Sequence, residues 1–323
     1  MQPLNICSLQ PFYGGSHKQF MRDWMKHSRH DWQVFSLPPR HWKWRMRHAA
    51  IEFAQQLDDA FNNGRRFDLI FCTDMLNLAE LRGLTKTKAS DIPTVLYFHE
   101  NQFVYPNRFE DPRDFHFPFT NFTSALAADR VWFNSQFNFD SMLAELKNLA
   151  EKLPDYSPDR AINSITGKSQ IQSPGIEIPE NVTATVEKDK LHIVWDARWE
   201  HDKNPDLLFE ILTRLSTHKC NFMLSVLGES FREVPGAFAQ IRTTFADQIC
   251  EWGFQESREQ YFAALKRGNV FLSTADHEFF GLAAIEAIAC GLRPVLPNRL
   301  AYPEILRNSS IENPEQYLSL IHI

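Results

Sequence analysis

Two glutamates and two cations in the second half of the chain have the types and spacing expected of residues that hold a phosphorylated ligand. Glu278 and Glu286 are eight residues apart. That spacing is about 12 Å along a helix axis, too far for an acid and a base that act on one bond, but suitable for holding two parts of a long ligand. Arg198 and Lys203 lie in a loop before a predicted helix, where a guanidinium fork and an ammonium point charge can clamp a diphosphate. A loop of surface salt bridges is the alternative interpretation of the two cations.

A predicted helix start between the two glutamates favours the phosphate interpretation. Gly281 and Leu282 stand at the beginning of a helix expected over 282–290, which is rich in alanine. The N–H groups and the dipole at a helix N-terminus favour a negative charge. The small alanine side chains also allow this helix to pack close to a sheet.

Polar residues follow a predicted strand in the first half of the chain. His99, Glu100, Asn101 and Gln102 come directly after an apolar strand over 94–98, and α/β enzymes place their sites at the carboxyl ends of parallel strands. A histidine at this place is able to bind or polarise a sugar hydroxyl. The alternative is a capped strand end with a solvated glutamate.

Two further strand ends are candidates for ligand binding. Gly14 and Gly15 follow the first strand and open the first helix, where the backbone can approach a ligand closely, and a tight turn is the alternative. The full motif G-x-G-x-x-G is absent, so a dehydrogenase-type dinucleotide site has no support. Asn134 and Ser135 follow the strand expected over 130–134, and capping of the next helix is the alternative.

A stretch without acidic residues, 32–51, combines fixed cations with aromatic rings. Cations neutralise phosphates and aromatic rings stack on unpaired bases, so this stretch predicts contact with a nucleic acid or another acceptor. A basic surface with its tryptophans packed inward is the alternative. The predicted contact residues are Arg40, Trp42, Lys43, Trp44, Arg45 and Arg47.

Short apolar runs alternate with helical patterns, which predicts parallel sheets with helices on both faces. Strands are expected at 4–9, 33–37, 68–72, 94–98, 130–134, 192–196, 222–227, 248–252, 270–273 and 293–296. Helices are expected at 48–62, 119–129, 137–152, 205–215, 236–246, 257–267 and 282–290. The alternation stops over 153–190, a proline-containing stretch that predicts a linker with one strand over 170–173. We therefore expect two α/β domains, residues 1–165 and 166–323, with ligands bound at the carboxyl ends of their strands.

The composition excludes several classes of protein. The chain is 43% apolar and 23% charged, which is ordinary for a globular protein, and no apolar run is long enough to span a membrane. Five scattered cysteines without C-x-x-C, and no signal-like N-terminus, favour a cytoplasmic protein without disulfides or structural zinc. The net charge of −6 falls entirely on residues after 178, so it excludes indiscriminate nucleic-acid binding but leaves a local basic patch possible.

The motifs of the second half resemble those of retaining GT-B glycosyltransferases. Glu278 and Glu286 match the E-x7-E pattern of those enzymes, and Arg198 with Lys203 resembles their diphosphate clamp. Residues 301–305 resemble the segment that follows in the sugar-nucleotide domain. The paired glycines near the N-terminus resemble the phosphate loop of the other domain. The resemblance implies two Rossmann-like domains that face a cleft.

A closer resemblance is to the tRNA-queuosine alpha-mannosyltransferase family, and residues 12–17, 97–106 and 276–281 carry it. It implies transfer of mannose from GDP-mannose onto the queuosine of tRNA-Asp, with retention of configuration and without a metal or cofactor. The catalytic residues that it implies are His99, Arg198, Lys203 and Glu278. The donor-binding residues that it implies are Gly14, Gly15, Asn134, Ser135, Phe279, Gly281, Leu282 and Glu286. Glu100, Asn101, Gln102 and the basic stretch are then expected to bind the acceptor.

Two other functions remain open on the sequence alone. One is a GT-B glycosyltransferase that acts on a lipid, a glycan or a small molecule, because such an enzyme shares every donor-site residue. The other is an inactive module that binds a sugar nucleotide or RNA, against which the intact charged motifs argue. GT-B enzymes normally end in helices that brace the N-terminal domain, and residues after 307 predict no such helices, so we expect them to be missing.

Overall fold

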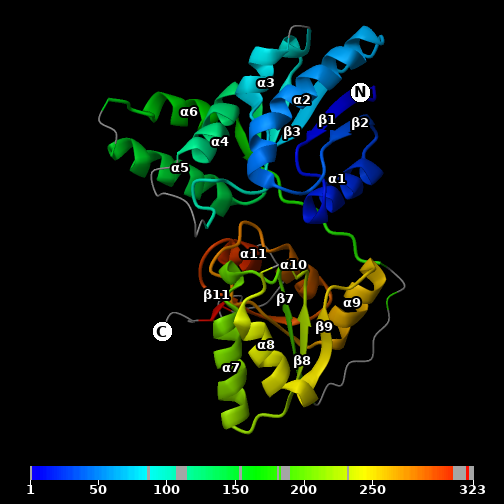
Figure 1. Cartoon of the computed structure of the whole chain (residues 1–323), viewed down its shortest axis with the longest axis vertical. Helices are drawn as coiled ribbons and strands as arrows, with labels where there is room; N and C mark the ends of the chain where they lie inside the picture. Colours follow the sequence, from blue (N-terminus) through cyan, green and yellow to red (C-terminus); the bar gives the residue numbers. More distant parts are fainter. Residues whose placement is uncertain are drawn as a thin grey trace. The chain divides into compact units, whose positions relative to one another are not determined.

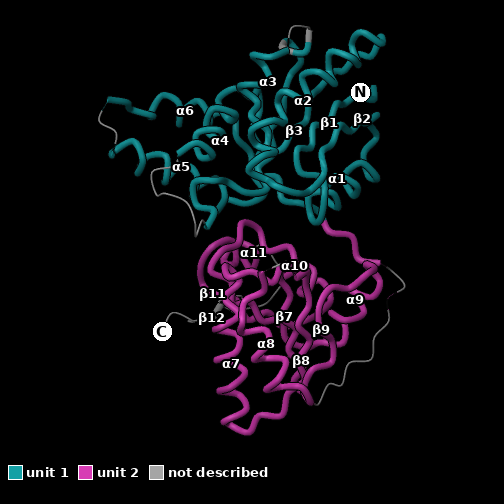
Figure 2. Tube along the Cα trace, viewed as in Figure 1, with its two compact units in different colours: residues 1–175 teal, residues 176–323 magenta. Residues whose placement is uncertain are grey.

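The computed structural model describes residues 2–85, 88–106, 115–152, 155–179, 182, 190–230, 233–307 and 318–319. The chain divides into two compact units, unit 1 over residues 1–175 and unit 2 over residues 176–323 (Figures 1 and 2). Each unit has its own parallel sheet with helices packed against it. The alternation of apolar runs and helical patterns is thus confirmed as two α/β folds.

Unit 1 contains a parallel sheet in the order β2-β1-β3-β4-β5-β6. Its strands are β1 Asn5–Gln10, β2 Asp31–Ser36, β3 Leu69–Thr73, β4 Thr94–Phe98, β5 Arg130–Phe133 and β6 Ser169–Ile171. Its helices are α1 Gly15–His27, α2 Trp42–Asn62, α3 Leu78–Leu84, α4 His116–Ala127, α5 Gln136–Glu151 and α6 Asp159–Lys168, with a 3-10 turn at Lys88–Asp91. Strands β1, β3 and β4 are almost fully buried, as expected of central parallel strands that read as continuous apolar runs.

Helix α2 begins six residues earlier than the predicted start at 48. Its first two turns carry cations and aromatic rings in place of an apolar stripe, so periodicity alone did not reveal them. Met46 is nevertheless buried in these turns, and His41, which precedes the helix, has a left-handed backbone with φ of 54°. The basic stretch is therefore the first part of a helix.

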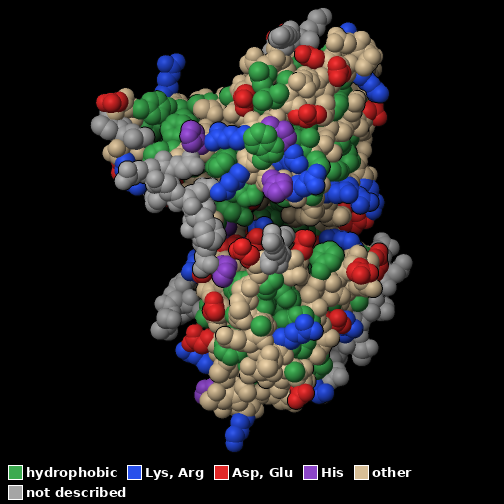
Figure 3. All heavy atoms as spheres, viewed as in Figure 1, with side chains coloured by type: hydrophobic (Ala, Val, Ile, Leu, Met, Phe, Trp, Pro, Cys, Tyr) green, Lys and Arg blue, Asp and Glu red, His purple; other side chains and the backbone are tan. Residues whose placement is uncertain are grey.

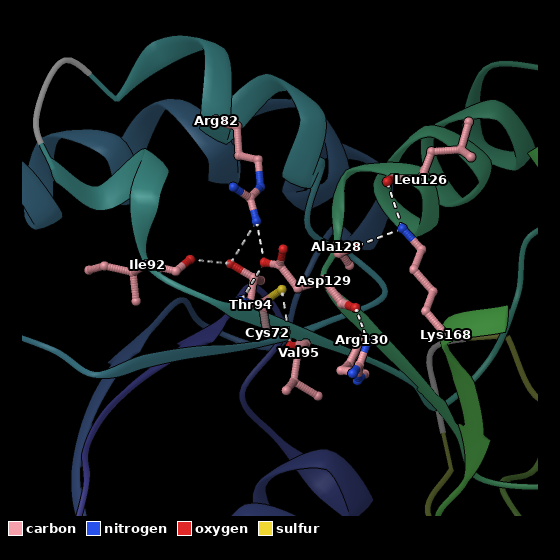
Figure 4. A network of polar contacts seen from close by, with 10 residues as sticks. All are labelled: Cys72, Arg82, Ile92, Thr94, Val95, Leu126, Ala128, Asp129, Arg130 and Lys168. Carbon is pink, nitrogen blue, oxygen red and sulfur yellow. Dashed lines mark hydrogen bonds and ion pairs between the residues drawn. The ribbon is translucent and has the colours of Figure 1, made fainter. Parts of the chain in front are cut away.

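The boundary between the units lies at Gly175, ten residues beyond the predicted boundary at 165. The two boundaries differ because α6 and β6 belong to unit 1, although the sequence around them is rich in proline and polar residues. Strand β6 pairs in parallel with β5. Lys168, at the end of α6, donates from Nζ to the carbonyl oxygens of Leu126 and Ala128 at 2.7 and 2.6 Å, at the C-terminus of α4 (Figure 4).

A second group of contacts in Figure 4 closes the amino edge of the unit 1 sheet. Arg82 donates from Nη2 to Asp129 Oδ2 at 2.7 Å and to Thr94 Oγ1 at 3.3 Å. The backbone N–H of Thr94 also donates to Asp129 Oδ2 at 2.8 Å. Thr94 opens β4 and Asp129 directly precedes β5, so this network lies at the strand ends opposite to the predicted site.

Unit 2 contains a parallel sheet in the order β12-β11-β10-β7-β8-β9. Its strands are β7 Leu191–Asp196, β8 Phe222–Leu227, β9 Ile249–Gly253, β10 Val270–Leu272, β11 Arg293–Pro297 and β12 Leu318–Ser319. Its helices are α7 Pro205–Thr217, α8 Gly236–Thr244, α9 Arg258–Arg267, α10 Leu282–Ala289 and α11 Tyr302–Arg307, with 3-10 turns at η2 His201–Lys203 and η3 Ala246–Gln248. The five strands predicted here are confirmed to within one residue at each end.

The expectation that bracing helices are missing concerns residues after 307. Of those residues, the structure describes 318–319 alone, which pair with β11 as β12. Strand β12 was not predicted from the sequence. The expectation itself lies outside the described residues.

Candidate functional site

The site residues predicted in the second half gather at the carboxyl ends of β7 and β10. The strand order reverses between these neighbours, because β7 leads to β8 on one side and β10 leads to β11 on the other. Ligands of open α/β sheets bind at such a switch point. The loop after β7 carries Arg198 and Lys203, and the loop after β10 carries Glu278, so the fold brings two separate sequence motifs together.

Lys203 is buried between these two loops. Its Nζ donates to the carbonyl oxygen of His277 at 2.6 Å, and it lies 3.2 Å from Asp202 Oδ2 and 3.5 Å from Glu278 Oε2. Thr274 donates from Oγ1 to the carbonyl oxygen of Lys203 at 2.7 Å, which ties the loops together. The side chain is only 6% exposed. Its ammonium charge is therefore held in a fixed place, with the two carboxylates balancing it.

Glu278 is the partner of that charge and stays ionised. Burial opposes its negative charge, but Lys203 and the backbone N–H groups of Gly281 and Phe280 more than compensate, so the pKa of Glu278 lies below its usual value. Gly281, which precedes α10, has a left-handed backbone with φ of 82°, and an added Cβ would lie 2.8 Å from Ile305 Cδ1. A glycine is required there both by conformation and by space.

A small pocket in unit 2 opens beside this pair. It is lined by Trp195, Asp196, Ala197, Lys203, Phe271, Ser273, Ala275, Glu278, Gly281, Ala283, Ala284 and Tyr302. A fixed cation, a carboxylate and the N-terminus of α10 therefore meet at one pocket. This combination suits an anionic ligand that also presents hydroxyl groups.

Other residues predicted for the donor site are near this pocket but do not line it. Arg198 is 46% exposed along its side chain and pairs with Glu200 at 3.3 Å. Phe279 is buried, with its ring centroid 4.5 Å from that of His277. Leu282 is the first residue of α10. We therefore assign Phe279 and Leu282 to the support of the loop and helix start.

Glu286 lies in a hydrogen-bonded network that the sequence did not predict. Its Oε1 accepts from Arg258 Nη1 at 3.0 Å, and its Oε2 contacts the Tyr261 hydroxyl at 2.8 Å. The same hydroxyl contacts Asp196 Oδ2 at 2.8 Å, and Arg258 Nη2 donates to the carbonyl oxygen of Glu177 at 2.9 Å. No spacing rule links these residues, which come from β7, α9 and α10. The one available signal was the position of Asp196 at the end of a predicted strand.

The burial of His277 predicts how the free energy of unfolding depends on pH. Burial, followed by the charge of Lys203, lowers the pKa of His277 from 6.5 to about 4. The unfolded chain takes up this proton below about pH 6.5 whereas the folded chain does not. We therefore expect the contribution of His277 to the free energy of unfolding to fall by about 3 kcal/mol as the pH is lowered from about 6.5 to 4.

Denaturant unfolding of His277→Asn at several pH values measures this contribution. The variant should lose stability less steeply than the wild type over the same pH range. His218→Asn, at an exposed position after α7, is the matched control and should keep the wild-type slope. An H277N slope equal to that of the wild type would contradict the assignment.

In unit 1, His99 lies at the carboxyl end of β4 among aromatic rings. Its ring centroid is 4.1 Å from that of His17, 4.7 Å from Tyr97 and 4.9 Å from Phe20. Burial, followed by His17, holds the pKa of His99 well below its usual value. The imidazole is therefore neutral near pH 7, and among the described residues its Nε2 has no hydrogen-bond partner. A neutral ring of this kind can bond a sugar hydroxyl as donor or acceptor.

Asp74 supports His99 and was missed by the sequence analysis. Its Oδ1 accepts from the backbone N–H of His99 at 3.0 Å, and its side chain is fully buried. Burial, followed by the charge of Glu100, raises the pKa of Asp74 well above its usual value. The signal was present, because Asp74 follows β3 just as His99 follows β4.

The other polar residues predicted at these strand ends bond to each other. Asn134 donates from Nδ2 to the carbonyl oxygen of His99 at 2.7 Å, and Ser135 caps α5 by accepting from the backbone N–H of Asn138 at 3.0 Å. Asn101 is fully buried and donates to Asn138 Oδ1 at 2.9 Å. Ser135 therefore has the helix-capping role that the sequence left as the alternative, and Asn134 and Asn101 hold neighbouring loops in place.

Gln102 and Glu100 form a pair at the same edge. Gln102 donates from Nε2 to Glu100 Oε1 at 3.0 Å, and its backbone N–H donates to Asn121 Oδ1 at 2.7 Å. Gln102 is 8% exposed, whereas Glu100 is half-buried. Glu100 is thus the more accessible of these two side chains at the end of β4.

The paired glycines have different roles. A Cβ on Gly14 would lie 2.4 Å from the side chain of Pro39, so a neighbouring loop fills the space that the sequence reserved for a ligand. Gly15 begins α1 with a left-handed φ of 50° and has open space around it. The tight-turn interpretation therefore accounts for Gly14, and Gly15 alone leaves room for a ligand.

The basic stretch of α2 divides into an inward and an outward part. Arg45 is 8% exposed and donates from Nε to the carbonyl oxygen of Pro38 at 3.1 Å. Trp42 packs with its ring centroid 5.3 Å from that of Phe117. We therefore leave Arg45 and Trp42 out of the proposed acceptor surface, because both support the fold of unit 1.

The outward part consists of exposed cations around one exposed ring. Trp44 is 61% exposed and stacks on His48 with centroids 5.1 Å apart. Arg40, Lys43 and Arg47 are exposed around it. In Figure 3, Lys, Arg and His side chains gather over the part of unit 1 where Figure 1 draws α2. We call Arg40, Lys43, Trp44 and Arg47 the α2 surface.

Metal-binding clusters and membrane-spanning helices are both absent from the described part of the chain. Within the described residues, no group of three or more His, Cys, Asp or Glu side chains is arranged to hold a metal ion. No helix among them combines the length and apolar character needed to cross a bilayer.

Comparison with solved structures defines the class of the fold. Sucrose-phosphate synthase from Thermosynechococcus elongatus superposes with a TM-score of 0.66 at 15% identity, over 95% of this chain and 84% of that chain. A glycosyltransferase from Rickettsia africae gives a TM-score of 0.61 at 15% identity, over 95% and 82% of the two chains. Two Rossmann-like parallel sheets, one with a Lys–Glu pair at its switch point, thus define a GT-B fold.

Comparison of the sequence then resolves the family. Residues 5–176 match the family described as tRNA-queuosine alpha-mannosyltransferase N-terminal, and residues 179–316 match glycosyl transferases group 1. The tRNA-queuosine alpha-mannosyltransferase of Drosophila melanogaster is 37% identical over 98% of this chain and 85% of its own length. The chain belongs to the tRNA-queuosine alpha-mannosyltransferase family.

Proposed function

We propose that the protein transfers mannose from GDP-mannose to the queuosine of tRNA-Asp, with retention of configuration. Membership of the family supports the reaction, and the proposal for the donor depends on one observation in unit 2. A buried ammonium, Lys203, contacts the carboxylate of Glu278 beside the N-terminus of α10. This arrangement offers fixed positive charge where a diphosphate leaves, and a hydrogen-bond acceptor for a sugar hydroxyl.

Four residues have separate roles in the proposed donor site. Lys203 and Arg198 stabilise the diphosphate as its charge develops, Lys203 from a fixed position and Arg198 from a more exposed one. Glu278 accepts hydroxyl groups of the sugar, and Glu286 accepts those of the ribose. Glu278 is paired with Lys203 and Glu286 with its own hydrogen-bond network, so neither suits the role of a glycosidase nucleophile. We therefore favour displacement on the face of the sugar that the diphosphate leaves, through an oxocarbenium-like transition state.

Unit 1 is proposed to recognise the acceptor, and His99 is proposed to bond a sugar hydroxyl. A neutral His99 suits a hydroxyl group, because a neutral imidazole can donate or accept a hydrogen bond. Glu100 and the α2 surface are proposed to contact the tRNA. A cytoplasmic location accords with such an acceptor and is part of the same proposal.

The donor proposal is tested by incubating the protein and a queuosine-containing tRNA with several labelled sugar nucleotides. We expect label from GDP-mannose to enter the tRNA at least about tenfold faster than label from UDP-glucose or UDP-galactose. Equal or faster transfer from a uridine sugar nucleotide would refute GDP-mannose as the donor. Transfer from GDP-mannose to a lipid or glycan at the same rate would instead refute the acceptor.

The α2 surface gives a prediction for tRNA binding. Replacing both Lys43 and Arg47 with alanine should weaken tRNA binding and reduce the slope of log K against log salt by about 0.7–0.9 for each phosphate that is no longer neutralised. Trp44→Ala should weaken binding by about 1–3 kcal/mol if its ring stacks on a base. Binding titrations at several salt concentrations measure both effects.

The controls for this prediction come from the same helix region. Arg65→Ala, at an exposed position just beyond the opposite end of α2, should leave tRNA affinity and its salt slope unchanged. GDP binding should be unchanged in all these variants. If the double variant binds tRNA like the wild type, the α2 surface is not the contact surface.

A further inference from the structure

A tyrosine hydroxyl in unit 2 lies within hydrogen-bond distance of two carboxyl groups. The Tyr261 hydroxyl lies 2.8 Å from Asp196 Oδ2 and 2.8 Å from Glu286 Oε2. Asp196 ends β7, Tyr261 is on α9 and Glu286 is on α10. Both distances are those of O–H···O hydrogen bonds. The phenol is therefore placed between two carboxyl groups from different elements.

The number of donors and acceptors determines which of these three groups carries a proton. A tyrosine hydroxyl donates one hydrogen bond and accepts others, whereas an ionised carboxylate accepts only. With both carboxylates ionised, one of the two contacts would be a repulsion between oxygens. Glu286 also accepts from Arg258 Nη1 at 3.0 Å, which stabilises its ionised form. The proton therefore belongs on Asp196, which donates to Tyr261, and Tyr261 donates to Glu286.

We propose that protonated Asp196 and Tyr261 are positioning residues that orient the Glu286 carboxylate for the ribose of the donor nucleotide. The inference rests on the proposed function, in which Glu286 accepts the ribose hydroxyls. Arg258 holds one oxygen of Glu286 and Tyr261 holds the other. A carboxylate can accept about four hydrogen bonds, so a carboxylate held in this way can still accept hydroxyl groups of a ligand.

The surroundings of Asp196 agree with a protonated carboxyl group. Burial, the largest cause, raises the pKa of Asp196 to about 7, the Tyr261 hydrogen bond opposes this, and the charges of Glu286 and Glu278 add to it. Glu278 and Lys203 line the same pocket as Asp196, from the loops after β10 and β7. Arg258 faces the group from α9 through Glu286. Two acidic groups, Glu286 and Glu278, and two cations, Lys203 and Arg258, thus face Asp196.

The proposal gives a sign for the effect of pH. Below about pH 7 Asp196 keeps its proton and the chain of hydrogen bonds is complete. Above it, Asp196 is ionised, Tyr261 can serve only one of two carboxylates, and Glu286 loses its fixed orientation. Nucleotide affinity is therefore expected to fall as the pH rises through about 7. The contribution of Asp196 to the free energy of unfolding is also expected to fall as the pH rises from about 4 to 7, because there the folded chain keeps a proton that the unfolded chain releases.

Two variants separate this proposal from a merely structural role. Asp196→Asn has the same shape and keeps an N–H donor for Tyr261, but it does not titrate. It should bind GDP with an affinity that changes less than about twofold from pH 6 to 8, whereas the wild type weakens about fivefold or more. Tyr261→Phe removes the hydroxyl that links Asp196 to Glu286. This variant should bind GDP about tenfold more weakly than the wild type at pH 6. Asp247→Asn, at an exposed position, is the control and should keep the wild-type pH profile.

Calorimetric titration with GDP, together with thermal unfolding of the same variants, tests the proposal without requiring sugar transfer. A wild-type pH dependence that persists in D196N, in either measurement, would overturn it. If the wild type does not bind GDP at any pH, the proposed donor fails and the role of Glu286 fails with it. In that case a difference in unfolding between wild type and D196N would still locate the proton on Asp196. Transfer that fails although GDP binding follows the predicted pH profile would count against the proposed acceptor only.

Discussion

Replacing Lys203 with methionine is expected to lower sugar transfer by about 10²–10³-fold and also to destabilise unit 2. Methionine keeps most of the apolar length of lysine but removes the ammonium that contacts the His277 carbonyl oxygen, Asp202 and Glu278. The developing charge of the diphosphate would then lack its fixed cation. The two carboxylates would be left without their partner in a largely buried site, which costs about 3 kcal/mol of unfolding free energy.

Initial rates of transfer and denaturant unfolding of the same preparation measure these two effects. Lys147→Met, at an exposed position on α5, is the matched control and should change neither. Lys203→Arg should recover part of the stability, because the charge remains, but little of the transfer rate, because the larger group disturbs the pocket. A methionine variant with wild-type turnover would exclude Lys203 from the donor site.

Replacing Arg198 with alanine is expected to lower transfer by a similar factor, about 10²–10³, while the protein stays as stable as the wild type. Arg198 is nearly half exposed, and its ion pair with Glu200 at 3.3 Å lies at the surface. Surface pairs of this kind contribute little to stability, so the unfolding free energy should change by less than about 0.5 kcal/mol. The lower transfer rate would reflect the missing guanidinium fork on the diphosphate.

The comparison of these two variants is itself informative. Transfer rates and melting temperatures of R198A and K203M should separate, with both inactive but only K203M less stable. Glu200→Gln removes the partner of Arg198 without removing the cation and serves as the control. If R198A transfers mannose within about twofold of the wild-type rate, the diphosphate clamp consists of Lys203 and the α10 N-terminus alone.

The sequence predicted the framework of both units because parallel strands and helices have strong local patterns. The five strands predicted in unit 2 agree within one residue, since each is a buried apolar run between turn signals. Helix α6 escaped prediction, and the strand predicted over 170–173, which corresponds to β6, was assigned to a linker, because prolines and polar residues surround both. Lys168 and the pairing of β6 with β5 attach them to unit 1, and contacts of this kind are not visible in local sequence.

Candidate site residues were predictable where each stands in a local motif of its own, and not where the fold alone brings them together. Lys203 and Glu278 were each identified from their own motif, and the structure places them 3.5 Å apart. The links from Glu286 to Tyr261 and Asp196 join three elements whose spacing carries no pattern. Arg45 shows the opposite error, because a cation in a basic run is normally exposed, whereas this one is buried against Pro38. Burial depends on which face of α2 a residue occupies, and the missed helix start concealed that face.

Identifying the nucleoside that the protein modifies tests the proposed acceptor most directly. Wild-type protein, GDP-mannose and tRNA-Asp are incubated, the tRNA is digested, and its nucleosides are separated and weighed by mass spectrometry. The same tRNA with guanosine in place of queuosine, and the R198A protein, are the controls. We predict that the queuosine nucleoside gains the mass of one hexose with wild-type protein, and that neither control gives this product. Unchanged queuosine, or a hexose on the guanosine-containing tRNA as well, would refute queuosine as the acceptor.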